Sequence, residues 1–279
     1  MCRCLPRTVC GRLKMADDGM IPDDADAKDR NFVTALARGL DVLRCFRNNE
    51  VTLTNSDFSE RTGLPKATIS RLTHTLCELD YLVADPRAGT YRLSAGVLQL
   101  GFGVLSGMDI SDRAEHTLRA LRDGPNSYIT AALGEQHRLD VVYLASQKSR
   151  EDVSLVMRIG SRLPLFHSAI GRAILVGMNE EEHARIFRFA GDQDPDIEAE
   201  GRKQLKVAKA EYEEKGFCSA YGTWRRDVNG IAVPVNSLAG ARVYGLNVGG
   251  PSFRVKRRQL ESAYGPLLIA AAAALSIRN

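Results

Sequence analysis

The stretch TNSDFSERTGLPKATISRLTHTLCELDYLVADPRAGTY, residues 54–91, decides the fold of the first part of this chain. Thr54 or Asn55 is suited to cap a short helix, because a side-chain oxygen there accepts a hydrogen bond from a free backbone N–H group. Gly63 is able to take the left-handed conformation that ends a helix. Pro65 stands where a second helix begins, since the first helical residue needs no N–H group. We therefore expect a helix, a tight turn and a second helix. The spacing of Leu36, Leu40, Leu43 and Phe46 predicts a further amphipathic helix upstream, whose apolar side packs under these two.

The second helix is expected to be amphipathic. Ile69, Leu72, Leu76 and Leu79 recur at spacings of three and four residues, which buries one stripe. The opposite face carries short, polar and basic side chains, which suit an element that enters the major groove of DNA. These side chains belong to Lys66, Ala67, Ser70, Arg71 and His74. An ordinary helix with a solvated polar face is the alternative that the helix alone leaves open.

A β-hairpin is expected directly after this helix. Residues 81–84 and 90–93 form its strands, and the segment Asp85-Pro86-Arg87-Ala88-Gly89 is typical of a turn. Arg87 and Arg92 are then available to bind the phosphates of the DNA backbone. A helix-turn-helix followed by such a hairpin is a winged helix-turn-helix, and the hairpin favours DNA binding over a merely solvated helix face.

The run GLPKATISRLTHTLCELDYL, residues 63–82, together with the hairpin closely resembles the IclR family of bacterial transcriptional regulators. The segments ALARGLDVLRCF, SRLPLFHSAIGRAIL and NGIAVPV resemble the same family, and the resemblance extends from Phe32 to the C-terminus. It implies an α+β fold, in which an N-terminal winged helix-turn-helix is joined by a linker helix to a GAF-like effector-binding domain. It also implies a DNA-binding regulator that responds to a small-molecule effector as a homodimer or homotetramer.

The chain has 279 residues, enough for two compact domains. The first region lacks large apolar residues and is expected to be a disordered tail, and Met15 or Met20 is an alternative to Met1 as the true start. A winged helix-turn-helix, a linker helix and a GAF-like effector-binding domain follow. The expected boundaries are residues 1–30, 31–94, 95–108 and 109–279.

Composition excludes several classes of protein. The net charge of +4 permits nucleic-acid binding without suggesting it. The longest apolar run, residues 266–277, is too short to span a bilayer, so no membrane partner is expected. Cys2, Cys4 and Cys10 lie close together in the sequence, but no second Cys or His cluster lies nearby to complete a zinc site. We therefore expect neither a metal nor a cofactor. A reducing, cytoplasmic location fits the cysteine pattern better than a disulfide framework.

The linker segment AGVLQLGFGVLS, Ala95–Ser106, is apolar on most sides. As a helix it would bury Val97, Leu98, Leu100 and Phe102 against something outside its own unit. A plain connector is one interpretation, and a helix that contributes to dimerisation is the one that the family favours. A dimer also makes physical sense, because one winged helix reads only a few base pairs and two units share a symmetric site.

The rest of the chain alternates between strand and helix patterns, which predicts an α+β layer fold. A polar turn is expected at residues 134–137. Strands are expected at residues 128–133, 139–145, 153–159, 230–236 and 243–248. Helices are expected at residues 109–122, 167–177, 180–190, 197–215 and from about Phe253 onward.

No catalytic constellation is found in the second domain. Ser168 follows His167 directly, and neighbouring residues cannot arrange a nucleophile, a base and an orienting group. We therefore expect no enzyme. An enzyme with an incidental helix-turn-helix stays an alternative, as does a module that uses its winged helix to bind protein, which would show no steep salt dependence.

Small residues occur at three places where a ligand could approach the backbone, namely residues 169–171, 229–230 and 247–251. A helix N-terminus there favours an anionic group, although glycines at strand ends also serve ordinary turns. The family resemblance implies that these segments form the wall of the effector pocket. The residues at the matching positions are Leu155, Leu163, Ala169, Ile170, Val228, Gly230, Asn247 and Gly249.

The expected pocket departs from relatives that bind small acids through polar side chains, because this chain has Ala220, Gly230 and Gly249 at such positions. A larger or more apolar effector is therefore expected. Trp224, the single tryptophan, and Arg225 precede this wall in the sequence. We expect an aromatic carboxylate, with Trp224 against the ring and an arginine near the charge.

Overall fold

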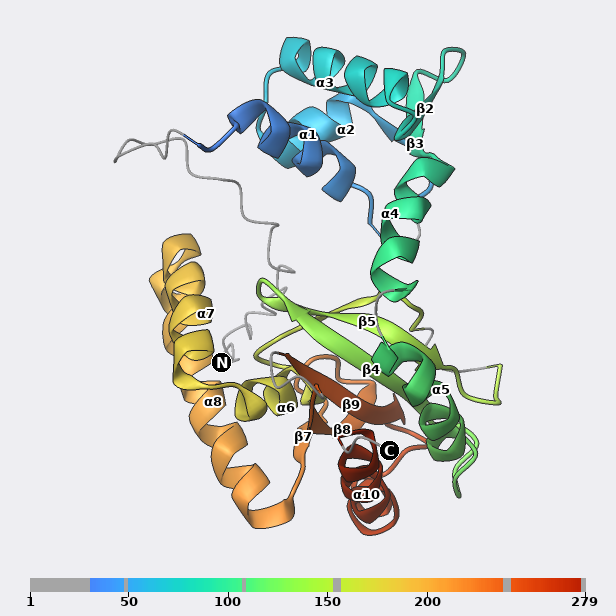
Figure 1. The fold of residues 1–279 in the computed structure, drawn as a ribbon, viewed down its shortest axis with the longest axis vertical. Coiled ribbons are helices and arrows are strands. Elements are labelled where there is room, and N and C mark those ends of the chain that lie inside the picture. Colours follow the sequence, from blue (N-terminus) through green and yellow to red (C-terminus); the bar gives the residue numbers. More distant parts are fainter. Residues whose placement is uncertain (1–30, 48–49, 107–108, 153–156, 238–241, 277–279) are drawn as a thin grey trace, which may run out of the picture. The chain divides into compact units, whose positions relative to one another are not determined.

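The computed structural model describes residues 31–47, 50–106, 109–152, 157–237 and 242–276. The chain divides between Val97 and Leu98 into two compact units, which we call the N-terminal unit and the C-terminal unit. Figure 1 shows a mainly helical N-terminal unit and a C-terminal unit built on an extended sheet. The order of helices and strands is that of an α+β protein.

The N-terminal unit is a winged helix-turn-helix, as the sequence predicts. Three helices pack around a small core, and a three-stranded antiparallel sheet of order β1-β3-β2 completes the unit. Phe58 and Ile69 are fully buried at the centre of this core. In chain order the elements are α1 (Thr34–Arg44), β1 (Leu53–Thr54), α2 (Asn55–Thr62), α3 (Lys66–Glu78), β2 (Leu82–Asp85) and β3 (Thr90–Leu93).

The predicted signals around the turn are confirmed. Thr54 caps α2, and a capping box links it to Asp57, whose backbone N–H group and carboxylate both bond to Thr54. Gly63 ends α2 with a φ of 68°, in the left-handed region that favours glycine. Pro65 lies immediately before the first residue of α3. Local sequence signals therefore mark where α2 ends and α3 begins.

Two predicted apolar stripes are only partly buried. On α1, Leu36 is 63% exposed and Leu40 is 44% exposed, because Val42 and Cys45 face the core instead. On α3, Leu79 is 58% exposed because the helix ends there and the chain turns away into β2. Thr73 occupies a fully buried position on α3 that the apolar pattern does not mark.

The linker segment forms α4 (Ala95–Ser106), with the bounds expected from the sequence. The division between the two units falls within this helix. Leu98, Leu100 and Phe102 are all more than half exposed in the single chain. Their burial against a partner stays a prediction.

The C-terminal unit contains a six-stranded antiparallel sheet of order β6-β5-β4-β9-β8-β7. The strands are β4 (Thr130–His137), β5 (Asp140–Gln147), β6 (Arg162–Pro164), β7 (Cys218–Tyr221), β8 (Val228–Asn236) and β9 (Val243–Pro251). The helices are α5 (Asp109–Arg122), α6 (Ala169–Gly177), α7 (Glu180–Gln193), α8 (Pro195–Lys215), the short α9 (Arg257–Gln259), a π-helix (Leu260–Tyr264) and α10 (Gly265–Ser276).

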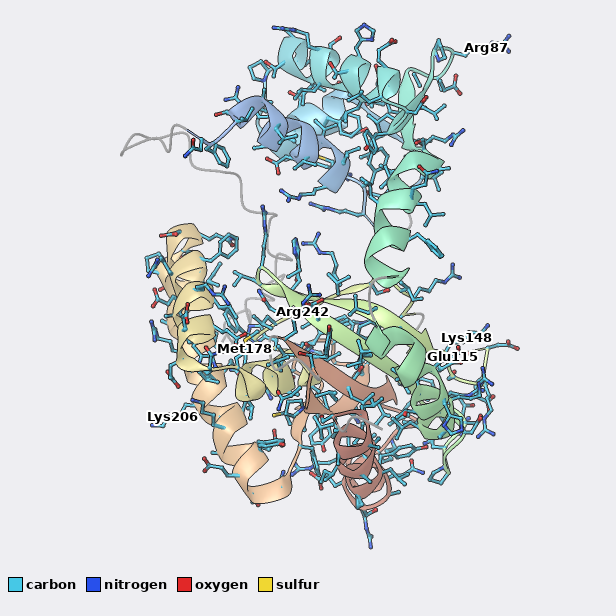
Figure 2. All side chains as sticks on the ribbon, viewed as in Figure 1. Arg87, Glu115, Lys148, Met178, Lys206 and Arg242 are labelled. Atoms are coloured by element: carbon cyan, nitrogen blue, oxygen red, sulfur yellow. The ribbon has the colours of Figure 1, made fainter. Side chains whose placement is uncertain are left out.

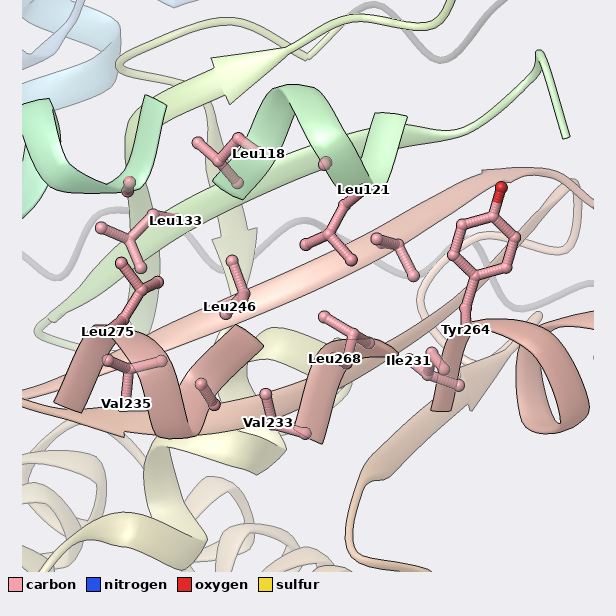
Figure 3. Close-up of a cluster of buried hydrophobic side chains, with 14 of the residues drawn as sticks. Leu118, Leu121, Leu133, Ile231, Val233, Val235, Leu246, Tyr264, Leu268 and Leu275 are labelled. Atoms are coloured by element: carbon pink, nitrogen blue, oxygen red, sulfur yellow. The ribbon is translucent and has the colours of Figure 1, made fainter. Parts of the chain in front are cut away.

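The two faces of this sheet carry different residues, because side chains alternate along a strand. One face packs against α5 and α10 through large aliphatic side chains, including Leu118, Ile231, Leu246 and Leu268 (Figure 3). The other face packs against α6 and carries small residues. A Cβ atom added to Gly245 would clash with Ile170, so the sheet and α6 approach each other closely there.

Several predicted boundaries in this unit are wrong. The turn expected at residues 134–137 is part of β4, and the chain turns at Arg138, whose φ is 55°. Gly134, which suggested a turn, lies at a register shift between β4 and β5. The strands β6 and β7 were not expected, because each is short. The C-terminal helices begin at Arg257 rather than near Phe253, and the expected strand at residues 153–159 lies partly outside the described residues.

Candidate functional site

The exposed face of α3 carries all five residues that the sequence assigns to DNA recognition. Lys66, Ala67, Ser70, Arg71 and His74 are exposed, whereas Ile69 on the opposite side is fully buried. The buried Thr73 hydroxyl lies 3.3 Å from Asn55 Oδ1 and 3.0 Å from the Ile69 carbonyl oxygen. This contact joins α3 to α2, so the exposed face is held in one orientation relative to the turn.

The hairpin that forms the wing also follows its expected design. Asp85 Oδ1 accepts hydrogen bonds from the backbone N–H groups of Arg87 and Ala88, which shapes the turn. Arg87 projects from the tip of this hairpin (Figure 2). Arg92 lies on β3 opposite Val83, and both residues are exposed. Two basic side chains of the wing are thus free of the core and available to an anionic surface.

Most of the residues expected to line the effector pocket belong to β8, β9 and α6, whereas Leu163 lies on β6 at the opposite edge of the sheet. Gly230 pairs with Gly249 across β8 and β9, and a Cβ atom on Gly230 would lie 4.0 Å from the Ala169 Cβ atom. Leu163, Ala169 and Ile170 belong to one buried apolar cluster. Val228 and Asn247 are each 8% exposed. Leu155 lies outside the described residues.

A buried polar pair lies within this otherwise apolar cluster. Asn247 Nδ2 donates a hydrogen bond of 3.0 Å to Tyr143 Oη. Asn247 Oδ1 is buried and has no hydrogen-bond partner among the described residues. Burial raises the pKa of the Tyr143 phenol, so its hydroxyl keeps a proton that it can donate. The pair therefore offers one free acceptor and one free donor, which is the pattern of a site for a polar ligand group.

The N-terminus of α6 lies in the same region. Ser168 caps this helix, since its Oγ atom accepts a hydrogen bond of 3.1 Å from the Gly171 N–H group. The first N–H groups of a helix have no partner within the helix and favour a negative charge. Ala169 and Ile170 supply such groups beside the small residues of β8.

The loop with the single tryptophan lies against the same cluster. Trp224 is partly buried against it. Arg225 stands over the tryptophan ring, with its Cζ atom 5.7 Å from the ring centroid, and it pairs with Asp227 at 2.6 Å. The Arg225 guanidinium thus already has an acidic partner, which the sequence did not reveal.

Tyr143 is the one member of this site that the sequence analysis missed. It lies on β5, and Asn247 lies on β9, with β4 between them. The available signal was the spacing of Val141 and Tyr143, because residues two positions apart on a strand lie on the same face. A buried tyrosine hydroxyl normally finds a polar partner, so Tyr143 marked a polar contact whose other member was unknown.

Neither a metal site nor a membrane-spanning helix is seen in the part of the chain that the structure describes. No group of three or more His, Cys, Asp or Glu side chains there is arranged to hold a metal ion. No helix within the described ranges is long and apolar enough to cross a membrane.

Comparisons with known proteins agree with this architecture. The helix-turn-helix domain of IclR matches residues 35–86, and the C-terminal domain of bacterial IclR transcriptional regulators matches residues 102–277. The transcriptional regulator TsaQ1/TsaQ2 of Comamonas testosteroni is 32% identical over 91% of both chains. The crystal structure of an IclR family transcriptional regulator from Brucella abortus is 41% identical, with a TM-score of 0.78, and the match covers 91% of this chain and 95% of that one.

A more distant structure shares the fold. It is an IclR homologue from Microbacterium hydrocarbonoxydans in complex with 4-hydroxybenzoate, 21% identical with a TM-score of 0.64, and the match covers 87% of this chain and 97% of that one. The two family domains together span most of the described residues and agree with the winged helix, the sheet and the order of elements. The chain therefore belongs to the IclR family, whose members are DNA-binding transcriptional regulators and not enzymes.

Proposed function

We propose that this regulator binds its operator through α3 and the wing, and that a hydroxylated aromatic carboxylate in the C-terminal unit controls this binding. In the proposed complex α3 enters the major groove, where Arg71 and Ser70 contact bases and His74 contacts a base or a phosphate. Ala67 allows close approach, and Lys66 binds a phosphate. Arg87 and Arg92 of the wing hold the DNA backbone.

The observation that carries the effector proposal is the buried, unpartnered Asn247 Oδ1 beside Tyr143 Oη. A buried acceptor without a partner costs about 1–3 kcal/mol, which a ligand hydroxyl group would recover. A carboxylate of the same ligand would accept hydrogen bonds from the Tyr143 hydroxyl and the N–H groups at the start of α6. The ligand therefore needs both a donor and an anionic group.

The apolar surroundings favour a ring as the body of this ligand. Leu163, Ile170 and Val228 would contact it, and Gly230 and Gly249 would let it approach the strand backbone. Trp224 would stack against the ring, and Arg225 would reach the carboxylate by leaving Asp227. The 4-hydroxybenzoate held by the distant Microbacterium homologue is of this chemical class and is a reasonable first ligand to test.

We also propose that the protein acts in the cytoplasm as a homodimer or a homotetramer. Two winged helices on a symmetric operator would double the number of base contacts. Leu98 and Phe102 of α4 are exposed and four residues apart, so they share an apolar face that is available to the partner subunit. Effector binding changes DNA affinity only where the ligand prefers one arrangement of the two DNA-binding units over another.

The experiment measures binding of the purified protein to the DNA that flanks its gene, at two salt concentrations, while Trp224 fluorescence is titrated with 4-hydroxybenzoate and benzoate. We expect selective, salt-sensitive DNA binding and a saturable fluorescence change that is stronger with the hydroxylated acid. Salt-insensitive DNA binding would favour a protein partner for the winged helix. A flat fluorescence titration with every benzoate-type acid would refute the effector class and leave the DNA proposal untouched.

A further inference from the structure

A groove with a volume of about 530 Å³ lies between α7 and α8. This volume falls within the range of small-molecule sites. None of the residues assigned to the effector wall lines it, so the groove is separate from the site described above. Apolar side chains of Ala184, Phe187 and Leu205 line it together with several charged groups.

The groove contains a buried hydrogen-bond acceptor that has no donor. His183 lines the groove and is only 3% exposed. Its Nε2 atom lies 2.7 Å from the Leu175 carbonyl oxygen, and because a carbonyl only accepts, Nε2 carries the proton. In the neutral ring Nδ1 is then an acceptor, and it has no hydrogen-bond partner among the described residues.

The nearest polar atom to that nitrogen does not satisfy it. Glu180 Oε1, which also lines the groove, lies 3.6 Å from His183 Nδ1. This separation exceeds hydrogen-bond distance, so Nδ1 stays without a hydrogen-bond partner among the described residues. A ligand O–H or N–H group placed at this edge of the ring would supply the missing donor.

Three cations follow the same wall of the groove. Arg202, Lys206 and Lys209 are spaced four and three residues apart on α8, which puts them on one face of the helix. Arg202 lies over the Phe187 ring at 4.5 Å and pairs with Glu198 at 2.7 Å, and Lys209 pairs with Glu180 at 3.3 Å. Lys206 has no acidic partner within ion-pair distance among the described residues, and Figure 2 shows it projecting from α8.

We propose that the groove between α7 and α8 is a second ligand site, which binds an organic anion with an apolar body and a hydroxyl group. The anionic group binds Lys206, with Arg202 beside it, and the hydroxyl donates to His183 Nδ1. Leu205 and Ala184 contact the apolar body. The size of the groove suits a fused two-ring body better than a single ring. This site goes beyond the effector pocket and does not depend on it.

The test uses 6-hydroxy-2-naphthoate as the probe and the full chain as the protein. Binding is measured by calorimetry for the parent, Lys206→Glu and Lys203→Glu. Lys203 is the control, because it is exposed on α8, does not line the groove and pairs with Glu200 at 3.7 Å. We expect Lys206→Glu to weaken binding about tenfold, since a charged hydrogen bond is lost, while Lys203→Glu changes it less than about twofold.

A second comparison tests the hydroxyl contact without altering a buried residue. The probe without its hydroxyl, 2-naphthoate, should bind the parent about two- to tenfold more weakly. The ¹⁵N signal of His183 Nδ1 should shift with 6-hydroxy-2-naphthoate and stay in place with 2-naphthoate. The proposal is overturned by no binding to the parent, by equal affinities of the two lysine variants, or by an Nδ1 signal that ignores the hydroxylated probe.

Discussion

Asn247 Nδ2 and Tyr143 Oη are 3.0 Å apart and join β9 to β5 across the intervening strand β4. The two residues are 104 positions apart in the sequence. Because both side chains face α6, their hydrogen bond lies inside the apolar layer between the helix and the sheet. The bond uses one polar atom of Asn247, and its Oδ1 has no hydrogen-bond partner among the described residues.

Replacing Tyr143 with Phe should lower the free energy of unfolding by about 1–3 kcal/mol, because Asn247 Nδ2 then loses its acceptor in a buried place. The double variant Tyr143→Phe/Asn247→Leu should be less destabilised than Tyr143→Phe alone, since it leaves no polar atom unpaired. Urea denaturation measures both. The folded double variant should no longer bind 4-hydroxybenzoate, and retained binding would remove this pair from the effector site.

Arg71→Ala should weaken binding to the operator by about 1–3 kcal/mol and relax the preference for particular bases, because Arg71 is proposed to contact a base edge. Arg44→Ala is the control, since the Arg44 guanidinium pairs with Asp41 at 2.9 Å on α1. Fluorescence anisotropy with operator and scrambled DNA distinguishes the two effects. Unchanged discrimination between these DNAs would show that Arg71 does not read sequence.

Lys66→Ala should act differently, because Lys66 is proposed to bind a phosphate. It should weaken binding to operator and scrambled DNA by similar factors and reduce the slope of log affinity against log salt by about 1. Titrations at several salt concentrations measure this slope. A slope equal to that of the parent would place Lys66 away from the DNA backbone.

Thr54→Ala should lower the free energy of unfolding by about 1 kcal/mol at neutral pH, because α2 loses its capping box. Hydrogen bonds from Thr54 hold the pKa of Asp57 below its ordinary value of 3.8. The ionised Asp57 carboxylate therefore stabilises the folded state fully above pH 3.8, its ordinary pKa. This stabilisation is lost as the pH falls through the lowered pKa.

The difference between parent and Thr54→Ala should accordingly shrink as the pH falls through this range. Urea unfolding at a series of pH values measures it. Thr54→Ser, which keeps the hydroxyl, should restore most of the loss. A deficit that stays constant down to acidic pH would mean that the Asp57 carboxylate takes no part in the cap.

The sequence predicted the winged helix well because its signals are local. Thr54, Gly63 and Pro65 each act on neighbouring backbone groups, so their effect is written in a few residues. The burial of Leu36 and Leu79 was predicted from periodicity alone and is wrong. Periodicity shows which residues share a face, but the neighbouring elements decide how much of that face is covered.

The effector site was harder to predict from sequence, because its parts meet only through the sheet. The small residues at 230 and 249 were recognised through the family, whereas Tyr143 needed the strand order that brings β5 and β9 to either side of β4. The ion pair between Arg225 and Asp227 likewise depends on the loop conformation. The roles assigned to the wall and recognition residues stay predictions until the binding experiments above are done.

The two-sided sheet of the C-terminal unit has a consequence for how such regulators diversify. Along β8, Gly230 and Ala232 face α6, while Ile231 and Val233 face α5 and α10. A substitution at Gly230 or Ala232 therefore alters the layer that faces α6, which holds the proposed effector site, and changes no side chain of the layer behind the sheet. If the proposed site is correct, single substitutions at alternate positions of one strand would change the ligand preference and leave the side chains of the opposite layer as they are.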